Sequence, residues 1–76
     1  MAKLPILKPK EVLRVLLRAG FYVHHQTGSH ARLFHDKRTS RVTVPIHSGD
    51  LPAYVLMSII RQAGMTKEEF LALLEQ

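Results

Sequence analysis

Cysteine and long apolar runs are absent from this sequence, and acidic residues are few. Without cysteine the chain has neither a disulfide framework nor a thiolate metal site, so its stability must come from apolar packing, as expected in a reducing compartment. No apolar stretch approaches the ~20 residues that a membrane span requires. Residues 1–5 also lack the apolar core of a signal peptide. These absences predict a cytoplasmic protein without a membrane-spanning segment.

The chain has 76 residues, of which 11 are Lys or Arg and 6 are Asp or Glu. A fold of this size buries only ~60–65% of the surface that its unfolded chain exposes, which leaves room for one small core. We therefore expect residues 1–76 to form a single domain. The formal net charge of +5 favours nucleic acid or an acidic protein as a partner, but it is equally typical of a solvated basic surface.

Hydrophobic spacing predicts two helices that flank a β-rich middle section. Pro9 suits the first turn of a helix, and apolar residues then recur at helical spacing as far as Gly20. The second helix follows a loop, in which Ser48 or Asp50 is the expected N-cap, and it ends at Gly64.

A third, short helix is predicted at the C-terminus. Thr66 with Glu69 three residues later forms a capping box. The segment from Arg61 to Phe70, which joins the last two helices, also resembles the turn of a helix-turn-helix DNA-binding motif. The exposed positions of the third helix include Glu68, Glu69 and Glu75, which repel phosphate, and this disfavours the DNA-binding alternative.

The middle section predicts an antiparallel meander of three strands. The expected strands are residues 21–26, 31–35 and 41–44, separated by turns at 27–29 and 36–39. If the first turn has three residues, Gln26 pairs with His30. If the second has four residues, Leu33 pairs with Val42. The two turns then place the apolar strand residues on one face of the sheet.

That apolar face is expected to pack under the first two helices, which gives an α+β two-layer sandwich. The opposite, open face is expected to carry Tyr22, His24, Gln26, His30, Arg32 and Phe34. Cations interleaved with aromatic rings form the kind of surface that single-stranded RNA uses. The same face is just as typical of a solvated sheet, so the pattern leaves both interpretations open.

The five histidines all lie within one third of the chain. The adjacent His24 and His25 are expected to point to opposite faces, and His35 to share the apolar side with His25. No cysteine, HExxH motif or close carboxylate pair completes a ligand set, so we predict no metal site and no cofactor. For these three histidines a structural role is expected.

Acid–base catalysis fits the other two histidines, His30 and His47, better than metal binding does, because an imidazole takes and gives protons near neutral pH. His30 follows the Gly28-Ser29 turn and His47 follows the third strand, so both are expected at one end of the open face. One would deprotonate a ribose 2′-hydroxyl and the other would protonate the 5′-oxygen leaving group. Arg32 or Arg41 would neutralise the phosphorane. Composition alone favours structural roles for both histidines.

Several segments of the chain, in this order, resemble the HicA family of mRNA-interferase toxins. They are Lys10–Leu13, Ala19–Phe21, Gln26–His30, Val42–Pro45 with His47, and Leu56–Gly64. The core motif is Gly28-Ser29-His30, and its position between the second and fourth segments is far more specific than a lone Gly-Ser-His tripeptide. The resemblance spans nearly the whole chain.

The resemblance implies a fold similar to double-stranded-RNA-binding domains, α-β-β-β-α, here with an additional short C-terminal helix. It implies a metal-independent endoribonuclease that acts on mRNA, and a HicB-type antitoxin that covers the active site. The catalytic histidine of the family motif falls on His30. His47 matches a usual family position, and its use as a second acid or base is our inference.

The residues expected to bind RNA are Gly28, Ser29, Arg32, Arg41, Tyr22, Phe34 and His24. The chain departs from the commonest family pattern at Ala31-Arg32, which adds charge beside the site, and at Lys8-Pro9, where Ser or Thr often caps the first helix. Neither change removes a catalytic group. An alternative function is a non-catalytic RNA-binding module of the same fold, which sequence spacing does not separate from the enzyme.

Overall fold

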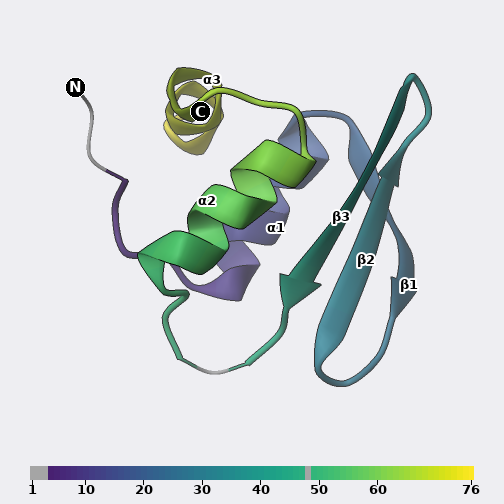
Figure 1. Cartoon of the computed structure of the whole chain (residues 1–76), viewed down its shortest axis with the longest axis horizontal. Coiled ribbons are helices and arrows are strands. Elements are labelled where there is room, and N and C mark those ends of the chain that lie inside the picture. The colour runs from purple at the N-terminus through teal and green to yellow at the C-terminus, as the bar shows by residue number, and fades with distance from the viewer. Residues whose placement is uncertain (1–3, 48) are drawn as a thin grey trace.

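The computed structural model describes residues 4–47 and 49–76 and contains helices and strands in the predicted order. The elements are α1 (Pro9–Arg18), β1 (Phe21–Gln26), β2 (His30–His35), β3 (Arg38–Pro45), α2 (Ala53–Gln62) and α3 (Lys67–Leu74). The strands form an antiparallel sheet in the order β1-β2-β3, and the helices all lie on one side of it (Figure 1). The predicted α+β fold, similar to double-stranded-RNA-binding domains, is confirmed.

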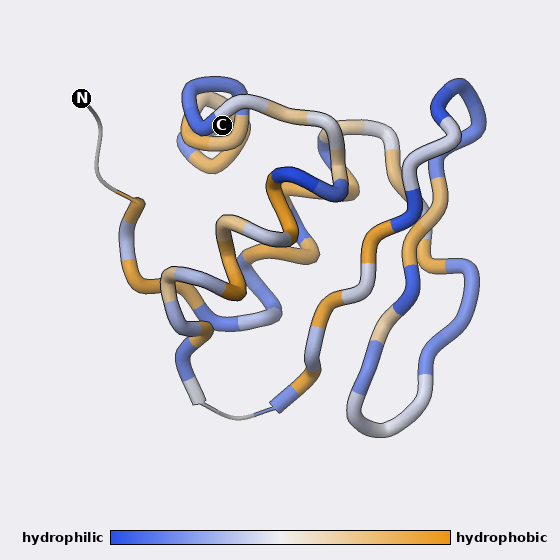
Figure 2. Tube along the Cα trace, in the orientation of Figure 1, coloured by the Kyte–Doolittle hydropathy of each residue, from blue (hydrophilic) through white to orange (hydrophobic). Residues whose placement is uncertain are grey.

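The core lies between the sheet and the two helices α1 and α2. Both helices contact β3, and α1 also contacts β1. Hydrophobic and hydrophilic residues alternate along β3, as expected for a strand with one face against a core (Figure 2). Ala31 and Leu33 of β2 and Val42 and Val44 of β3 are fully buried. None of the helices within the described residues combines the length and the apolar character needed to cross a membrane.

Helix α3 packs mainly against α1 and adds the fully buried ring of Phe70 to the core. The predicted capping box is present, because Glu69 N donates to Thr66 Oγ1 at 3.0 Å and Thr66 N donates to Glu69 Oε1 at 2.9 Å. The backbone N–H and then the side chain of Thr66 lower the pKa of the Glu69 carboxyl group. At the other end of α3, Arg18 Nη1 donates to Leu73 O at 2.7 Å. The Arg18 guanidinium therefore holds the end of α3 against α1.

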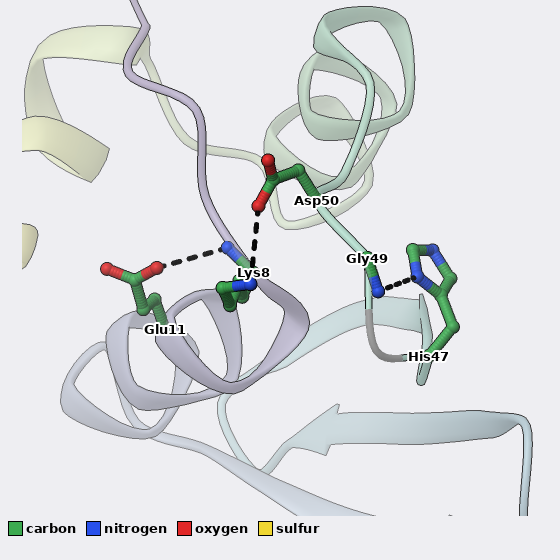
Figure 3. Close-up of polar contacts among 5 residues, drawn as sticks. All are labelled: Lys8, Glu11, His47, Gly49 and Asp50. Carbon is green, nitrogen blue, oxygen red and sulfur yellow. Dashed lines mark hydrogen bonds and ion pairs between the residues drawn. The ribbon is translucent and has the colours of Figure 1, made fainter.

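The prediction that the Asp50 side chain caps α2 is wrong. Ser48, the other predicted cap, lies outside the described residues. Helix α2 begins after Pro52 without a side-chain cap. Because the residue before a proline favours extended geometry, the chain stays extended at Leu51, whose N–H donates to Leu7 O at 2.8 Å. Asp50 Oδ1 instead lies 3.7 Å from Lys8 Nζ (Figure 3). This contact joins the loop before α2 to the start of α1.

The β2–β3 hairpin has the predicted register but a tighter turn. Leu33 pairs with Val42, and Arg32 pairs with Thr43. The turn is shorter than predicted, since His35 pairs with Arg38 and β3 begins at Arg38 rather than at residue 41. The pairing register shifts between Phe34 and His35, and this shift accommodates the shorter turn. The register beyond it follows from burial, because a slip by one residue would expose the apolar side chains.

The predicted pairing of Gln26 with His30 in the β1–β2 hairpin is wrong. The register shifts between Val23 and His25, so that His25 pairs with Arg32 and Gln26 pairs with Ala31. His24 is thus the extra residue of a β-bulge. The cause is visible in the burial pattern, since every residue of β1 after Phe21 is exposed and no buried side chain holds that end of the strand in register.

Candidate functional site

The turn between β1 and β2 is organised by the side chain of Thr27. Its Oγ1 accepts hydrogen bonds from Ser29 N at 3.4 Å and from His30 N at 3.1 Å. The backbone N–H of Thr27 donates to His30 O at 2.9 Å. Threonine hydroxyl groups commonly stabilise turns in this way. The start of β2, and with it the backbone of His30, is therefore held by several hydrogen bonds from one residue.

The His30 side chain is exposed and is oriented by its neighbour. Ser29 Oγ lies 3.1 Å from His30 Nδ1. With Nδ1 engaged by the hydroxyl group, Nε2 is the ring nitrogen that remains for a ligand. The turn thus presents one imidazole nitrogen to solvent at a defined place on the open face.

A pocket on the open face brings His30 together with residues from all three strands. This histidine pocket is lined by His25, Thr27, His30, Arg32 and Thr43.

The expectation that His24 and His25 point to opposite faces is wrong, because the bulge turns His25 toward Arg32. The prediction of Gln26 on the open face is wrong for the same reason. Sequence reasoning missed His25, and no sequence signal marks a bulge in a strand without buried residues.

His47 does not join His30 in this pocket. It lines a separate pocket near the start of α1, together with Gln26, Ile46 and Lys8 among others. His47 Nδ1 accepts a hydrogen bond from Gly49 N at 3.2 Å (Figure 3). The two histidines that the sequence suggested as an acid–base pair therefore line different pockets.

His35 has a structural role. Its Nε2 lies 3.2 Å from Ala19 O, and its ring packs edge-on against Phe21 with ring centroids 5.0 Å apart. These contacts tie the end of β2 to the turn that follows α1. No group of three or more His, Cys, Asp or Glu side chains within residues 4–47 and 49–76 is arranged to hold a metal ion.

An aromatic cluster surrounds Phe34 on the open face. The His24 ring stacks on Phe34 with centroids 4.1 Å apart and an interplanar angle of 3°. Tyr22 lies 6.5 Å away, centroid to centroid, and Arg41 Cζ lies 5.0 Å from the centre of the Phe34 ring. The contact with Arg41 is a cation–π interaction. The bulge residue His24 and the pairing of Phe34 with Arg41 create this cluster.

Strand β2 connects the histidine pocket to the aromatic cluster. His30, Arg32 and Phe34 alternate with the buried residues Ala31 and Leu33, so all three side chains lie on the open face. Four strand steps of about 3.3 Å separate His30 from Phe34. Six of the residues predicted to bind RNA thus lie on or beside the open face, namely Ser29, Arg32, Arg41, Tyr22, Phe34 and His24, and Gly28 lies in the turn before β2.

A family model described as HicA toxin of bacterial toxin–antitoxin matches residues 9–65. The chain belongs to the HicA toxin family. Family membership makes it the toxin of a toxin–antitoxin system, which confirms the resemblance found in the sequence. The matched range contains α1, the whole sheet, α2 and every residue of the histidine pocket, whereas α3 lies beyond it. No curated protein matches the chain.

The openness of the Gly28-Ser29 turn leads to a prediction about stability. A Cβ atom added at Gly28 would meet no heavy atom within 4 Å, and Gly28 does not have a positive φ. Gly20, in contrast, has φ +100°, and its Cβ would lie 2.7 Å from His35 Nε2. We expect Gly28→Ala to leave the free energy of unfolding unchanged or to raise it by up to about 1 kcal/mol, whereas Gly20→Ala lowers it by more than about 1 kcal/mol.

Urea unfolding of both variants and the wild type measures the difference. A loss for Gly28→Ala as large as that for Gly20→Ala would contradict the open geometry of the turn.

Proposed function

We propose that this toxin is an endoribonuclease that cleaves mRNA without a metal ion, with His30 as its catalytic residue. The observation that carries the proposal is the exposed His30 imidazole, held at Nδ1 by Ser29 and placed beside the Arg32 guanidinium in one pocket. A proton-transfer group next to a cation is what attack on a phosphodiester requires. Family membership supports the assignment, since His30 occupies the histidine of the Gly-Ser-His motif.

The first step is removal of a proton from a ribose 2′-hydroxyl by His30 Nε2. The 2′-oxygen then attacks the adjacent phosphorus atom. Ser29 Oγ accepts a hydrogen bond from Nδ1–H both in the neutral ring, whose Nε2 is free, and in the imidazolium. The ring therefore keeps its orientation while Nε2 gains and loses the proton. Arg32 stabilises the negative charge that develops on the phosphorane oxygens.

The aromatic cluster around Phe34 holds the RNA strand on the same face. Bases stack on exposed aromatic rings without sequence-specific contacts, and cations beside the rings bind the phosphates. His24, Phe34 and Tyr22 supply the stacking surface, and Arg41 supplies the cation. The turn at Gly28 leaves space for the backbone of the RNA to approach His30.

A non-catalytic RNA-binding module is the second candidate function. The same cluster of rings and cations favours it, because stacking and charge bind RNA without any proton transfer. The two functions differ only in whether the bound strand is cut.

Replacing His30 separates these two functions. The His30 side chain is exposed, so His30→Ala leaves no cavity and should cost well under the ~2–5 kcal/mol typical of core truncations. Loss of a positioned base should slow cleavage of a labelled RNA by about 10²–10⁴-fold, while RNA binding remains. EDTA in the assay should not inhibit the wild type.

Circular dichroism and melting curves of His30→Ala provide the control for folding. Full cleavage by a natively folded His30→Ala protein would reject His30 as the catalytic residue. RNA binding by the wild type without any cleavage would support the binding module instead.

The RNA-binding face is tested by the salt dependence of affinity. Arg32 lies on the open face, whereas Arg14 is also exposed but belongs to α1, on the helical side of the sheet. For single strands the slope of log K against log salt changes by about 0.7 for each phosphate contact. We expect Arg32→Gln to flatten this slope by about that amount and Arg14→Gln, which removes the same charge, to leave it unchanged. Equal slopes for the two variants would place the RNA on another face.

The toxin's partner is an antitoxin, and a HicB-type antitoxin with an acidic surface fits the cations around His30 and Arg32. Carboxylates placed over this pocket would bind Arg32 and exclude RNA from His30. The backbone amides of residues 28–32 should therefore exchange hydrogen more slowly in the complex with the cognate antitoxin than in the free toxin. Unchanged exchange in this segment, with protection elsewhere, would reject direct occlusion of the site.

A further inference from the structure

We infer that His25 is the second acid–base residue of this site, the general acid that protonates the 5′-oxygen leaving group. The inference rests on the proposed ribonuclease function and adds a second residue to its site. It replaces His47, which the sequence suggested for that role. Three observations carry it: the β-bulge, the shared pocket and the hydrogen bonds of the competing histidine.

The bulge decides which face His25 occupies. In a regular strand, continuing from the pair Val23–Leu33, His25 would lie opposite Ala31, whose side chain is fully buried under the helices. The register shift instead places His25 opposite Arg32, and Arg32 lies on the open face. One extra residue in β1 therefore moves an imidazole from the helix side of the sheet into the pocket of His30.

The strand pairing makes His25 and His30 near neighbours on the open face. His30 lies two residues before Arg32 on the same face of β2, so His25 and His30 are diagonal neighbours across the strand pair. Such neighbours have Cα atoms about 7–8 Å apart. Both side chains line one pocket with Arg32. A phosphate bound in this pocket would lie near the Arg32 cation, and we assign one of the two imidazoles to each of its reacting oxygens.

The surroundings of His25 leave its ring available for proton transfer. No side-chain hydrogen bond within residues 4–47 and 49–76 involves the His25 ring, and its side chain is exposed. The groups that share its pocket are His30 and Arg32 of β2, Thr43 of β3 and Thr27 of the turn, and none of these is a carboxylate. His47, in contrast, lines another pocket, and its Nδ1 is engaged by Gly49 N.

The complete step conserves protons and bonds. The 2′-hydroxyl proton moves to His30 Nε2 while the 2′-oxygen forms a bond to phosphorus. The bond from phosphorus to the 5′-oxygen breaks, and the His25 imidazolium gives its proton to that oxygen. The products are a 2′,3′-cyclic phosphate and a 5′-hydroxyl group. His30 is left protonated and His25 neutral, and exchange of protons with water restores both.

An RNA with sulphur in place of the scissile 5′-oxygen tests this role, because a thiolate leaves without a proton. A thiol has a pKa of roughly 8.5, far below that of an alcohol. We expect His25→Ala and His25→Gln to cleave ordinary RNA about 10²–10⁴-fold more slowly than the wild type. With the sulphur-containing RNA both variants should cleave at close to the wild-type rate. His30→Ala should remain slow with either RNA, because the 2′-hydroxyl still requires a base.

His47→Ala is the matched comparison, since it removes the competing imidazole. Rescue by the sulphur substrate in His47→Ala, or equal losses for His25→Gln with both substrates, would overturn the assignment of His25. Normal cleavage of ordinary RNA by His25→Gln would overturn it as well and would leave the role of His30 standing. Cleavage of neither RNA by the wild type would instead reject the ribonuclease function itself, and with it this inference.

Discussion

The burial of Ala31 and Leu33 beneath the helices is the constraint on which the candidate site depends. Neither side chain is exposed to solvent, and each pairs with a buried valine of β3. Because strand side chains alternate, the residues between and around them must face solvent. His30, Arg32 and Phe34 are therefore placed in a row by the packing of their neighbours. The apolar core and the charged surface are two consequences of one alternating strand.

The edge strand β1, unlike β2, is not held in register by alternating buried side chains. Only Phe21 is buried in it, so the remainder of the strand is free to shift without loss of apolar contacts. The register shift uses this freedom and places His25 beside His24 on the open face, where His24 stacks on Phe34 and His25 lines the pocket of His30. A sheet edge that contributes little to the core is thus a place where functional side chains can be re-aimed at small cost in stability.

Helix α3 lies beyond the region matched by the HicA family model, yet it is part of the same core. Phe70 is fully buried, and the Arg18 guanidinium of α1 donates to the carbonyl oxygen of Leu73 near the end of α3. The helix packs on the side of α1 that leaves the open face of the sheet uncovered (Figure 1). It therefore contributes to the fold without covering His30 or Arg32.

The sequence by itself determined the order of the elements, the β2–β3 register, the capping box of α3 and the place of His30 after its turn. Each of these depends on a local signal: buried residues at a period of two, or Thr66 and Glu69 at their capping spacing. Only the tertiary structure decided that His25 shares a pocket with His30, that His47 lines another pocket and that Asp50 contacts Lys8. Those placements depend on strand pairing and loop paths among exposed residues, where no buried side chain leaves a pattern in the sequence.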